Sequence, residues 1–157
     1  MPRVGVLALQ GDVREHVSML EGIGCVVLRV RHAEQLEDLT ALVLPGGEST
    51  TMARLLTTSN VREPLARRIA EGMSVLGTCA GLILLSQRVL DGRDDQWSYG
   101  AIDVAVRRNG YGRQIASFEG EVMVAGLGDE PVPTVFIRAP VVESAGPGVQ
   151  VLSLIHI

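Results

Sequence analysis

Residues 74–87 read S-V-L-G-T-C-A-G-L-I-L-L-S-Q, and this stretch decides the fold. Its first residues are typical of a short buried strand, and the apolar run from Leu82 onward is typical of a helix. Cys79 lies between them, with Gly77 and Gly81 on either side. A sharp strand-to-helix turn needs glycine at such positions for steric clearance, and in enzymes this kind of turn carries a nucleophile. The stretch therefore predicts an α/β fold with Cys79 at the tip of a turn.

Two interpretations of Cys79 are open at this point. The partial positive charge of the following helix N-terminus would favour a thiolate, which is the form of cysteine that attacks carbonyl groups. The amide of Ala80 would then point toward an oxyanion formed on the attacked carbonyl. The alternative is a structural cysteine, because free cysteine is among the most buried residue types.

The composition predicts a soluble cytoplasmic protein of one domain. A chain of 157 residues can bury a full core, and 46% apolar with 3% aromatic content predicts aliphatic packing, as in parallel sheets. A net charge of −4 without a basic run argues against nucleic-acid binding. Cys25 and Cys79 make no disulfide framework, and a reactive thiol suits a reducing compartment, so we count Cys25 as a core residue. The N-terminal apolar run is too short for a signal peptide or a membrane span.

Strands and helices are expected to alternate in the first ninety residues. Buried strands are predicted at residues 3–9, 25–30, 41–44 and 75–76, with helices at about 12–22, 52–56, 60–71 and from 82 onward. Asp12 is predicted to cap the first helix. Such repeated strand–helix units imply a flavodoxin-like, doubly wound, mostly parallel sheet with helices on both faces. A further strand is predicted at residues 102–106 by alternation, and strands at residues 117–124 and 134–137 are expected to be antiparallel additions in the C-terminal third.

A second glycine-rich stretch, P-G-G-E-S-T-T at residues 45–51, follows the third predicted strand. Gly46 and Gly47 allow the backbone to approach a ligand at the carboxyl edge of the sheet, where Cys79 is also expected. A phosphate cradle is the alternative, but the stretch has no P-loop lysine and no G-x-G-x-x-G spacing.

Several polar residues have a structural and a functional interpretation. His16 lies beside the inward stripe of the first predicted helix, and a structural role is favoured over a ligand role. Arg108, Arg113 and Arg138 would ordinarily be solvated surface charges. Within a binding site each could instead hold a carboxylate through bidentate pairing.

Four stretches together resemble the glutaminase subunit of pyridoxal 5′-phosphate synthase, which is a class I, triad-type glutamine amidotransferase. They are L-A-L-Q-G at residues 7–11, L-P-G-G-E-S-T-T-M at 44–52, G-T-C-A-G-L at 77–82, and the pair formed by R-N with G-R-Q at 108–114 and F-I-R-A-P at 136–140. The resemblance extends from about residue 3 to residue 152.

The resemblance implies a specific reaction. Cys79 would attack the side-chain amide of L-glutamine and release ammonia, leaving a glutamyl thioester that water hydrolyses. The amides of Gly47 and Ala80 would form the oxyanion hole. The residues implied to hold glutamine are Gly46, Gly47, Glu48, Arg108, Ile137 and Arg138. No metal or cofactor is implied. In such a hetero-oligomer, ammonia passes to a separate barrel-shaped synthase subunit that makes the vitamin B6 cofactor.

The sequence departs from that family at its C-terminal end. The family supplies the general base and its orienting carboxylate from a His-Pro-Glu stretch well beyond R-A-P, whereas His156 is followed by Ile157 alone. We assign the base to none of His16, His32 or His156. Residues 1–152 are expected to form a C-terminally incomplete glutaminase domain, and residues 153–157 an apolar tail from a fragment or a shifted reading frame. A natural short variant is the alternative.

Without the triad His and Glu, the chain as given is expected to have little glutaminase activity. A non-catalytic module that binds glutamine or docks on the synthase is therefore an alternative function. A different cysteine enzyme on a similar sheet, such as a stress-protein or peptidase relative, is disfavoured by the P-G-G-E-S and R-N-G-Y-G-R-Q stretches.

Overall fold

The computed structural model describes residues 1–109 and 117–155. The elements, in chain order, are β1 (Arg3–Leu7), α1 (Val13–Gly22), β2 (Val26–Val30), the 3-10 helix η1 (Ala33–Leu36), β3 (Ala41–Leu44), α2 (Ser49–Thr58), α3 (Arg62–Ala70), β4 (Ser74–Gly77), α4 (Ala80–Leu85), β5 (Ser86–Val89), β6 (Ile102–Arg107), β7 (Phe118–Val122), β8 (Val132–Phe136) and β9 (Val141–Ala145). The predictions on Arg113, on the G-R-Q motif and on His156 lie outside the described residues.

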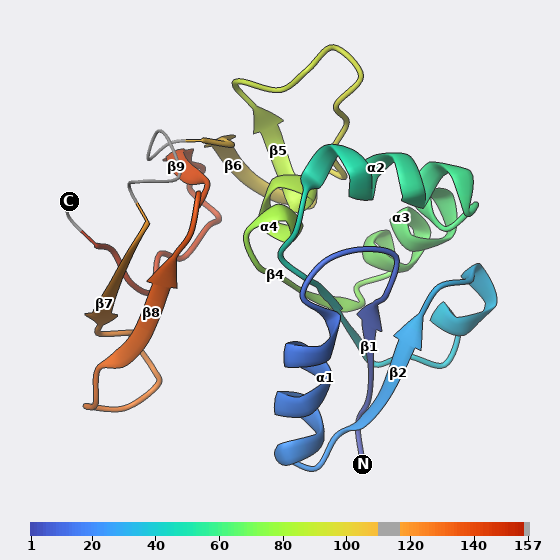
Figure 1. Cartoon of the computed structure of the whole chain (residues 1–157), viewed down its shortest axis with the longest axis horizontal. Coiled ribbons are helices and arrows are strands. Elements are labelled where there is room, and N and C mark those ends of the chain that lie inside the picture. The colour runs from blue at the N-terminus through green and yellow to red at the C-terminus, as the bar shows by residue number, and fades with distance from the viewer. Residues whose placement is uncertain (110–116, 156–157) are drawn as a thin grey trace.

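A four-stranded parallel sheet forms the centre of the fold (Figure 1). Its strand order is β2-β1-β3-β4, and Val4 of β1 pairs with Val27 on one side and Ala41 on the other. This order places two helical crossovers on opposite faces, as a flavodoxin-like sheet requires. The carboxyl ends of all four strands meet at one edge, where the loops after β1, β3 and β4 lie together.

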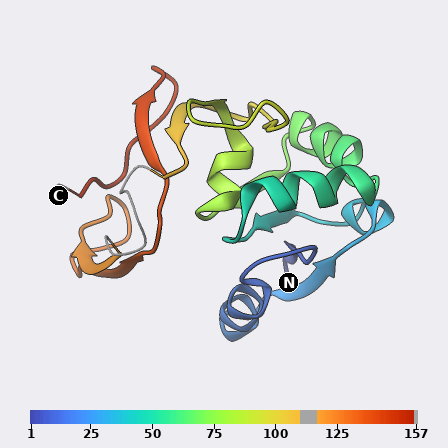
Figure 2. The same cartoon turned by 45° about the horizontal axis from the view of Figure 1, so that its top comes forward.

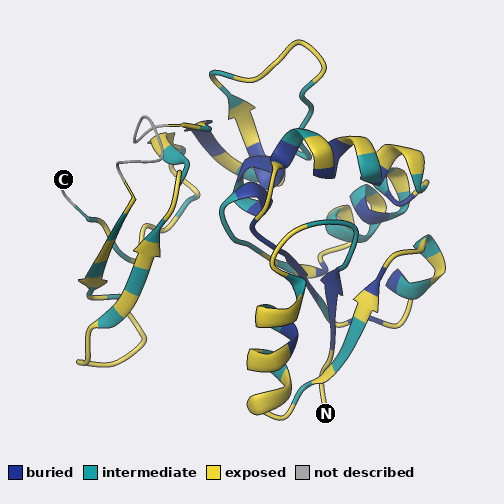
Figure 3. Cartoon of the chain, viewed as in Figure 1, coloured by how far each residue is buried: buried dark blue, intermediate teal, exposed yellow. Residues whose placement is uncertain are grey.

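Alternating side chains of the strands pack against helices on both faces of the sheet. Val4 and Val43 pack with Val17 of α1 on one face. Leu42 and Leu44 pack with α2, α3 and α4 on the other. Figure 2 shows α1 on one side of the sheet and α2 with α3 on the other, and Figure 3 shows that the buried residues concentrate between these layers. The predicted doubly wound α/β architecture is confirmed.

The C-terminal third adds two small sheets. One has the order β5-β6-β9, with β6 and β9 antiparallel, and the other is the antiparallel pair β7 and β8. In that pair the rings of Phe118 and Phe136 stack at 4.7 Å between centroids. The predicted antiparallel additions are therefore confirmed, although β9 was not predicted.

The helix after Cys79 is shorter than the apolar run predicts. α4 ends at Leu85, where the buried Ser86 donates its hydroxyl to the carbonyl of Ile83 at 2.7 Å and the chain turns into β5. Val89 of β5 packs with β6, so strand pairing overrides the helical pattern here.

Two other local predictions need correction. Asp12 is at the N-cap position of α1, but its side chain makes no capping hydrogen bond. The helix predicted at residues 52–56 is the longer α2, which begins at Ser49 because the Glu48 side chain caps it. Among the described residues, no helix is long and apolar enough to cross a bilayer.

Candidate active site

Cys79 lies in a strained turn between β4 and α4. Its backbone angles are φ 48° and ψ −104°, a region that residues with a side chain rarely adopt. A Cβ atom on Gly77 would lie 2.7 Å from the carbonyl carbon of Gly81. A Cβ atom on Gly81 would overlap the carbonyl oxygen of Leu44. The turn therefore needs glycine on both sides of Cys79 for the steric reason that the sequence predicts.

The loop after β3 packs directly against this turn. Because Leu44 of β3 pairs with Gly77 of β4, the residues that follow the two strands are neighbours. A Cβ atom on Gly46 would lie only 3.5 Å from the Cβ atom of Cys79. The structure thus brings Gly46 and Cys79 together at the carboxyl edge of the sheet, as predicted.

The two amides proposed for the oxyanion hole have no hydrogen-bond partner among the described residues, and Ala80 is fully buried. The carbonyl of Gly46 accepts a hydrogen bond from the amide of Asp12 at 3.0 Å. In a trans peptide the carbonyl and the following N–H point in opposite directions, so the Gly47 N–H points away from Asp12. In residues 1–109 and 117–155, no hydrogen bond engages the amide of Gly47 or that of Ala80. Their joint role stays a prediction.

The Glu48 carboxylate caps α2. It accepts hydrogen bonds from the amide of Thr50 at 3.0 Å and from the amide and hydroxyl of Thr51 at 2.7 and 2.6 Å. Partial burial acts to raise the pKa of Glu48, but the hydrogen bonds from Thr51 and Thr50 outweigh it and hold the pKa at about 2. Glu48 is therefore ionised at neutral pH.

Arg108 lies against this carboxylate. Its Nη2 is 3.2 Å from Glu48 Oε1, and its side chain is only 18% exposed. The two oxygens of Asp91 accept hydrogen bonds from the amides of Arg108 at 2.6 Å and Asn109 at 3.3 Å. The interpretation of Arg108 as a solvated surface charge is wrong, because the backbone is held and the side chain is packed.

The loop that carries Asp91 is anchored by aromatic contacts. The guanidinium of Arg62 lies 4.1 Å from the ring centroid of Trp97, and Trp97 meets Tyr99 edge-on at 5.0 Å. The Tyr99 hydroxyl donates to the carbonyl of Arg62 at 3.4 Å, and burial raises the pKa of Tyr99 despite the nearby Arg62 charge. These contacts fix the loop after β5, and with it Arg108.

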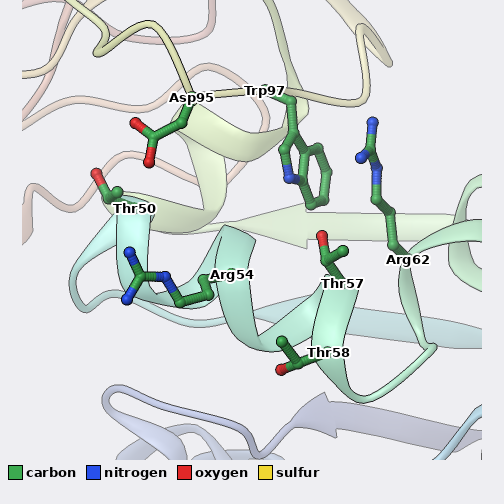
Figure 4. Close-up of a pocket in the computed structure, with 7 residues that line it drawn as sticks. All are labelled: Thr50, Arg54, Thr57, Thr58, Arg62, Asp95 and Trp97. Atoms are coloured by element: carbon green, nitrogen blue, oxygen red, sulfur yellow. The ribbon is translucent and has the colours of Figure 1, made fainter.

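Two hollows lie beside α2. The larger has a volume of about 290 Å³ and is lined by Thr50, Arg54, Thr57, Thr58, Arg62, Asp95 and Trp97 (Figure 4). Cys79 does not line it. The other has a volume of about 260 Å³ and is lined by Glu48, Thr50, Thr51, Arg54, Arg93 and Arg108. This second hollow contains Glu48 and Arg108, two of the residues predicted to hold an amino acid, and Cys79 does not line it either.

Ile137 and Arg138 do not contact Cys79, Glu48 or Arg108 in this structure. Both are exposed and follow β8, and Arg138 has φ 43°. Figures 1 and 2 both show the β7–β8 pair apart from β4 and α4. Within the described ranges, no hydrogen bond or ion pair joins either residue to Cys79, Glu48 or Arg108. Their role in glutamine binding stays a prediction.

Two residues in contact with the site were not predicted to belong to it. Gln10 Oε1 accepts a hydrogen bond from the amide of Glu48 at 3.0 Å, and a side chain on Gly47 would collide with Gln10. His16 Nε2 lies 3.1 Å from the hydroxyl of Thr78. The L-A-L-Q-G motif could have indicated Gln10, because Gln10 follows the predicted strand at residues 3–9 at the same carboxyl edge of the sheet as Gly46 and Cys79. Nothing in the spacing of His16 indicates its distant partner.

The general base is not identified within the described residues. No hydrogen bond in residues 1–109 and 117–155 engages the sulfur of Cys79, and His32 is the N-cap residue of η1, where its amide donates to the side chain of Gln35. His156 lies outside the described part of the chain.

Comparison with known proteins gives the family. Residues 6–156 match the SNO glutamine amidotransferase family. A protein of Nocardioides sp. named pyridoxal 5′-phosphate synthase subunit PdxT is 53% identical over 155 residues, which is 99% of this chain and 77% of that protein. A Parafrankia sp. protein with the same name is 55% identical over 152 residues, which is 97% of this chain and 75% of that protein.

Solved structures agree with this assignment. A crystal structure of a glutamine amidotransferase superposes with a TM-score of 0.89 at 44% identity, covering 97% of this chain and 79% of its own. PurLQS from Thermotoga maritima superposes with a TM-score of 0.64 at 16% identity, covering 97% of this chain and 73% of its own, which supports the fold alone. The chain belongs to the SNO glutamine amidotransferase family.

Proposed function

We propose that the chain is the glutaminase subunit of a pyridoxal 5′-phosphate synthase, with Cys79 as its nucleophile. The observation that carries the proposal is the strained Cys79 turn packed against Gly46, with the amides of Gly47 and Ala80 free of hydrogen bonds to the described residues. Acyl transfer needs a nucleophile and backbone donors that meet at the attacked carbonyl, and we infer that Cys79 and these two amides fill these roles.

The proposed reaction proceeds through a thioester. The Cys79 thiolate attacks the carboxamide carbon of glutamine, forming a C–S bond and an oxyanion that the Gly47 and Ala80 amides stabilise. Collapse of this intermediate breaks the C–N bond, and the nitrogen takes up a proton and leaves as ammonia. Water then attacks the thioester, the C–S bond breaks, and glutamate and the thiol are released.

The charged pair formed by Glu48 and Arg108 supports an amino-acid substrate. Glu48 carries a negative charge that suits an α-ammonium group, and the forked donors of Arg108 suit an α-carboxylate. Ile137 and Arg138 would complete this subsite by approaching it from the β8 end, as the family resemblance implies. We expect no nucleic-acid partner, since the chain carries a net charge of −4.

The relatives are named as subunits of a synthase, which supports a hetero-oligomer with a synthase subunit as the partner. Ammonia released at Cys79 would pass to that subunit, which the resemblance describes as barrel-shaped.

A non-catalytic module that binds glutamine is the second candidate. It is favoured by one observation, namely that no imidazole in the described ranges is hydrogen-bonded to the Cys79 sulfur. A thiol without a base would bind glutamine without turning it over at an appreciable rate.

The chloroketone analogue of glutamine separates these functions, because a thiolate displaces its chloride and forms a stable thioether. We expect one equivalent of label on Cys79, competition by L-glutamine, and no label on the Cys79→Ser variant. The Cys25→Ser variant is the matched control and should label like the wild type. An unlabelled wild-type chain that still binds glutamine in calorimetry would overturn the glutaminase and establish the binding module.

A further inference from the structure

The strained backbone of Cys79 has to be held by its neighbours, and the adjacent Thr78 makes three hydrogen bonds. The Thr78 amide donates to the carbonyl of Leu44 at 3.1 Å, and its carbonyl accepts from the amide of Gly81 at 2.8 Å. Its hydroxyl lies 3.1 Å from Nε2 of His16, in a hydrogen bond between residues 62 positions apart. Every polar group of Thr78 is therefore engaged, and its three partners come from three elements, β3, α4 and α1.

His16 belongs to the face of α1 that packs on the sheet. Val13, His16, Val17 and Leu20 are buried or half-buried, whereas their neighbours in the helix are exposed. This is the i, i+3, i+4, i+7 spacing of an inward helical face. Three of these side chains are apolar and join the core cluster around Val4. The imidazole is the polar member, and it is aimed at the turn that carries the nucleophile.

The start of α1 is itself fixed relative to the site. Gly11 lies so close to the carbonyl of Gly46 that a Cβ atom there would collide with it, and the amide of Asp12 donates to the same carbonyl. Gly46 in turn packs against Cys79. His16 therefore extends from a helix that is anchored one turn earlier to the active-site loop, and its reach to Thr78 is set by that anchor.

We propose that His16 is a positioning residue of the active site. Its hydrogen bond to Thr78 holds the Cys79 turn in the geometry in which the sulfur attacks bound glutamine. The inference rests on the proposed function of Cys79 and extends it to a residue that touches neither glutamine nor the reacting atoms. Losing the contact should slow the attack and leave the binding of the substrate intact.

A merely structural histidine would behave differently. Removing it would lower the stability of the fold, but the folded molecules would still react at the wild-type rate. The two roles are separated by measuring alkylation with the chloroketone analogue at several concentrations. The maximal alkylation rate at saturation reports the attack, and the half-saturating concentration reports binding.

The variants to compare are His16→Ala, His16→Gln, Thr78→Val, Thr78→Ser and the double variant His16→Ala with Thr78→Val. We expect His16→Ala and Thr78→Val each to lower the maximal alkylation rate by roughly two- to tenfold, the effect of losing one hydrogen bond, with an unchanged half-saturating concentration. His16→Gln and Thr78→Ser retain a partner and should recover most of the rate. The double variant should be no slower than the slower single variant, since both remove the same contact.

His32→Ala is the matched control, because this other described histidine is the N-cap residue of η1 and makes no hydrogen bond to the Cys79 turn within the described ranges, so its loss should leave the maximal rate unchanged. Should His16→Ala fail to fold, His16→Gln and Thr78→Val still test the contact. A His16→Ala rate equal to that of the wild type, or a double variant whose loss is the product of the two single losses, would overturn this inference alone. An unreactive wild-type thiol would overturn the proposed function, and this inference with it.

Discussion

The Glu48 carboxylate lies 3.2 Å from the guanidinium of Arg108, a residue 60 positions later in the chain, while it also caps the N-terminus of α2. One oxygen is shared between Arg108 and the amide of Thr50, and the other accepts both donors of Thr51. The same side chain therefore begins a helix and contacts the guanidinium of Arg108, which we propose as a substrate-binding charge. A substitution at Glu48 is expected to affect both stability and binding.

The pH dependence of stability provides a test of Glu48. Its pKa is lowered from the ordinary 4.5 to about 2, so its contribution is complete above 4.5 and is lost as the pH falls toward 2. We expect Glu48→Gln to flatten the acid side of a urea-unfolding profile in this window, by about 1 kcal/mol at most because solvent screens a half-exposed group. Glu21→Gln is the control, since Glu21 is an exposed α1 carboxylate without a side-chain partner among the described residues. An unchanged acid limb in Glu48→Gln would contradict the capping role.

Arg108 is predicted to act in binding rather than in the chemical step. Arg108→Gln should raise the half-saturating concentration of the chloroketone analogue about ten- to hundredfold, because a charge-assisted contact to the carboxylate is lost. The maximal alkylation rate should stay within about twofold, since Arg108 does not touch the reacting carbon. Arg107→Gln is the adjacent control, because Arg107 pairs with Glu143 on the exposed side of the strand. Equal effects of the two substitutions would argue against a substrate contact at Arg108.

Gly81 is predicted to be intolerant of a side chain. A Cβ atom at this position overlaps the backbone carbonyl of Leu44, which cannot rotate away as a flexible side chain would. We expect Gly81→Ala to lower the free energy of unfolding by about 3 kcal/mol or more. Gly22→Ala provides the matched control, because a Cβ atom there meets no atom within 4 Å, and it should be neutral or stabilise by about 0.5 kcal/mol. Chemical denaturation of both variants gives the comparison, and a mild loss in Gly81→Ala would mean that the turn can relax.

Strain at Cys79 predicts that glycine stabilises this position. Because φ 48° with ψ −104° is costly for a residue with a side chain, Cys79→Gly should raise the free energy of unfolding by about 1 kcal/mol, whereas Cys79→Ala should not. Asn60→Gly is the control at another positive φ, 57°, where asparagine is tolerated and little change is expected. If Cys79→Gly were less stable than Cys79→Ala, the turn would not be strained.

Local hydrophobic patterns predicted the strands of the central sheet because the polarity of each residue reflects whether its own side chain is buried. The apolar run at Ala41–Leu44 matches β3 in both bounds, since a strand covered on both faces has to be continuously apolar. The hydrophobic pattern predicted a continued helix after Leu85, but a short apolar run is compatible with either a helix or a strand, and the structure has β5 there. Pairing of β5 with β6 made the choice there, and no local signal encodes a partner sixteen or more residues away.

The sequence by itself determined the family and the parallel sheet, and it placed Cys79 in a turn where glycines at steric contacts leave few alternatives. Only the tertiary structure decided which side chains contact one another around the site. Arg108 lies at Glu48 and not in solvent, Gln10 holds the amide of Glu48, and His16 reaches Thr78. These are contacts between side chains from different elements, and only the packing of α1, α2 and the sheet sets the distances between them. Spacing along the chain carries no information on such distances once a turn or a crossover intervenes.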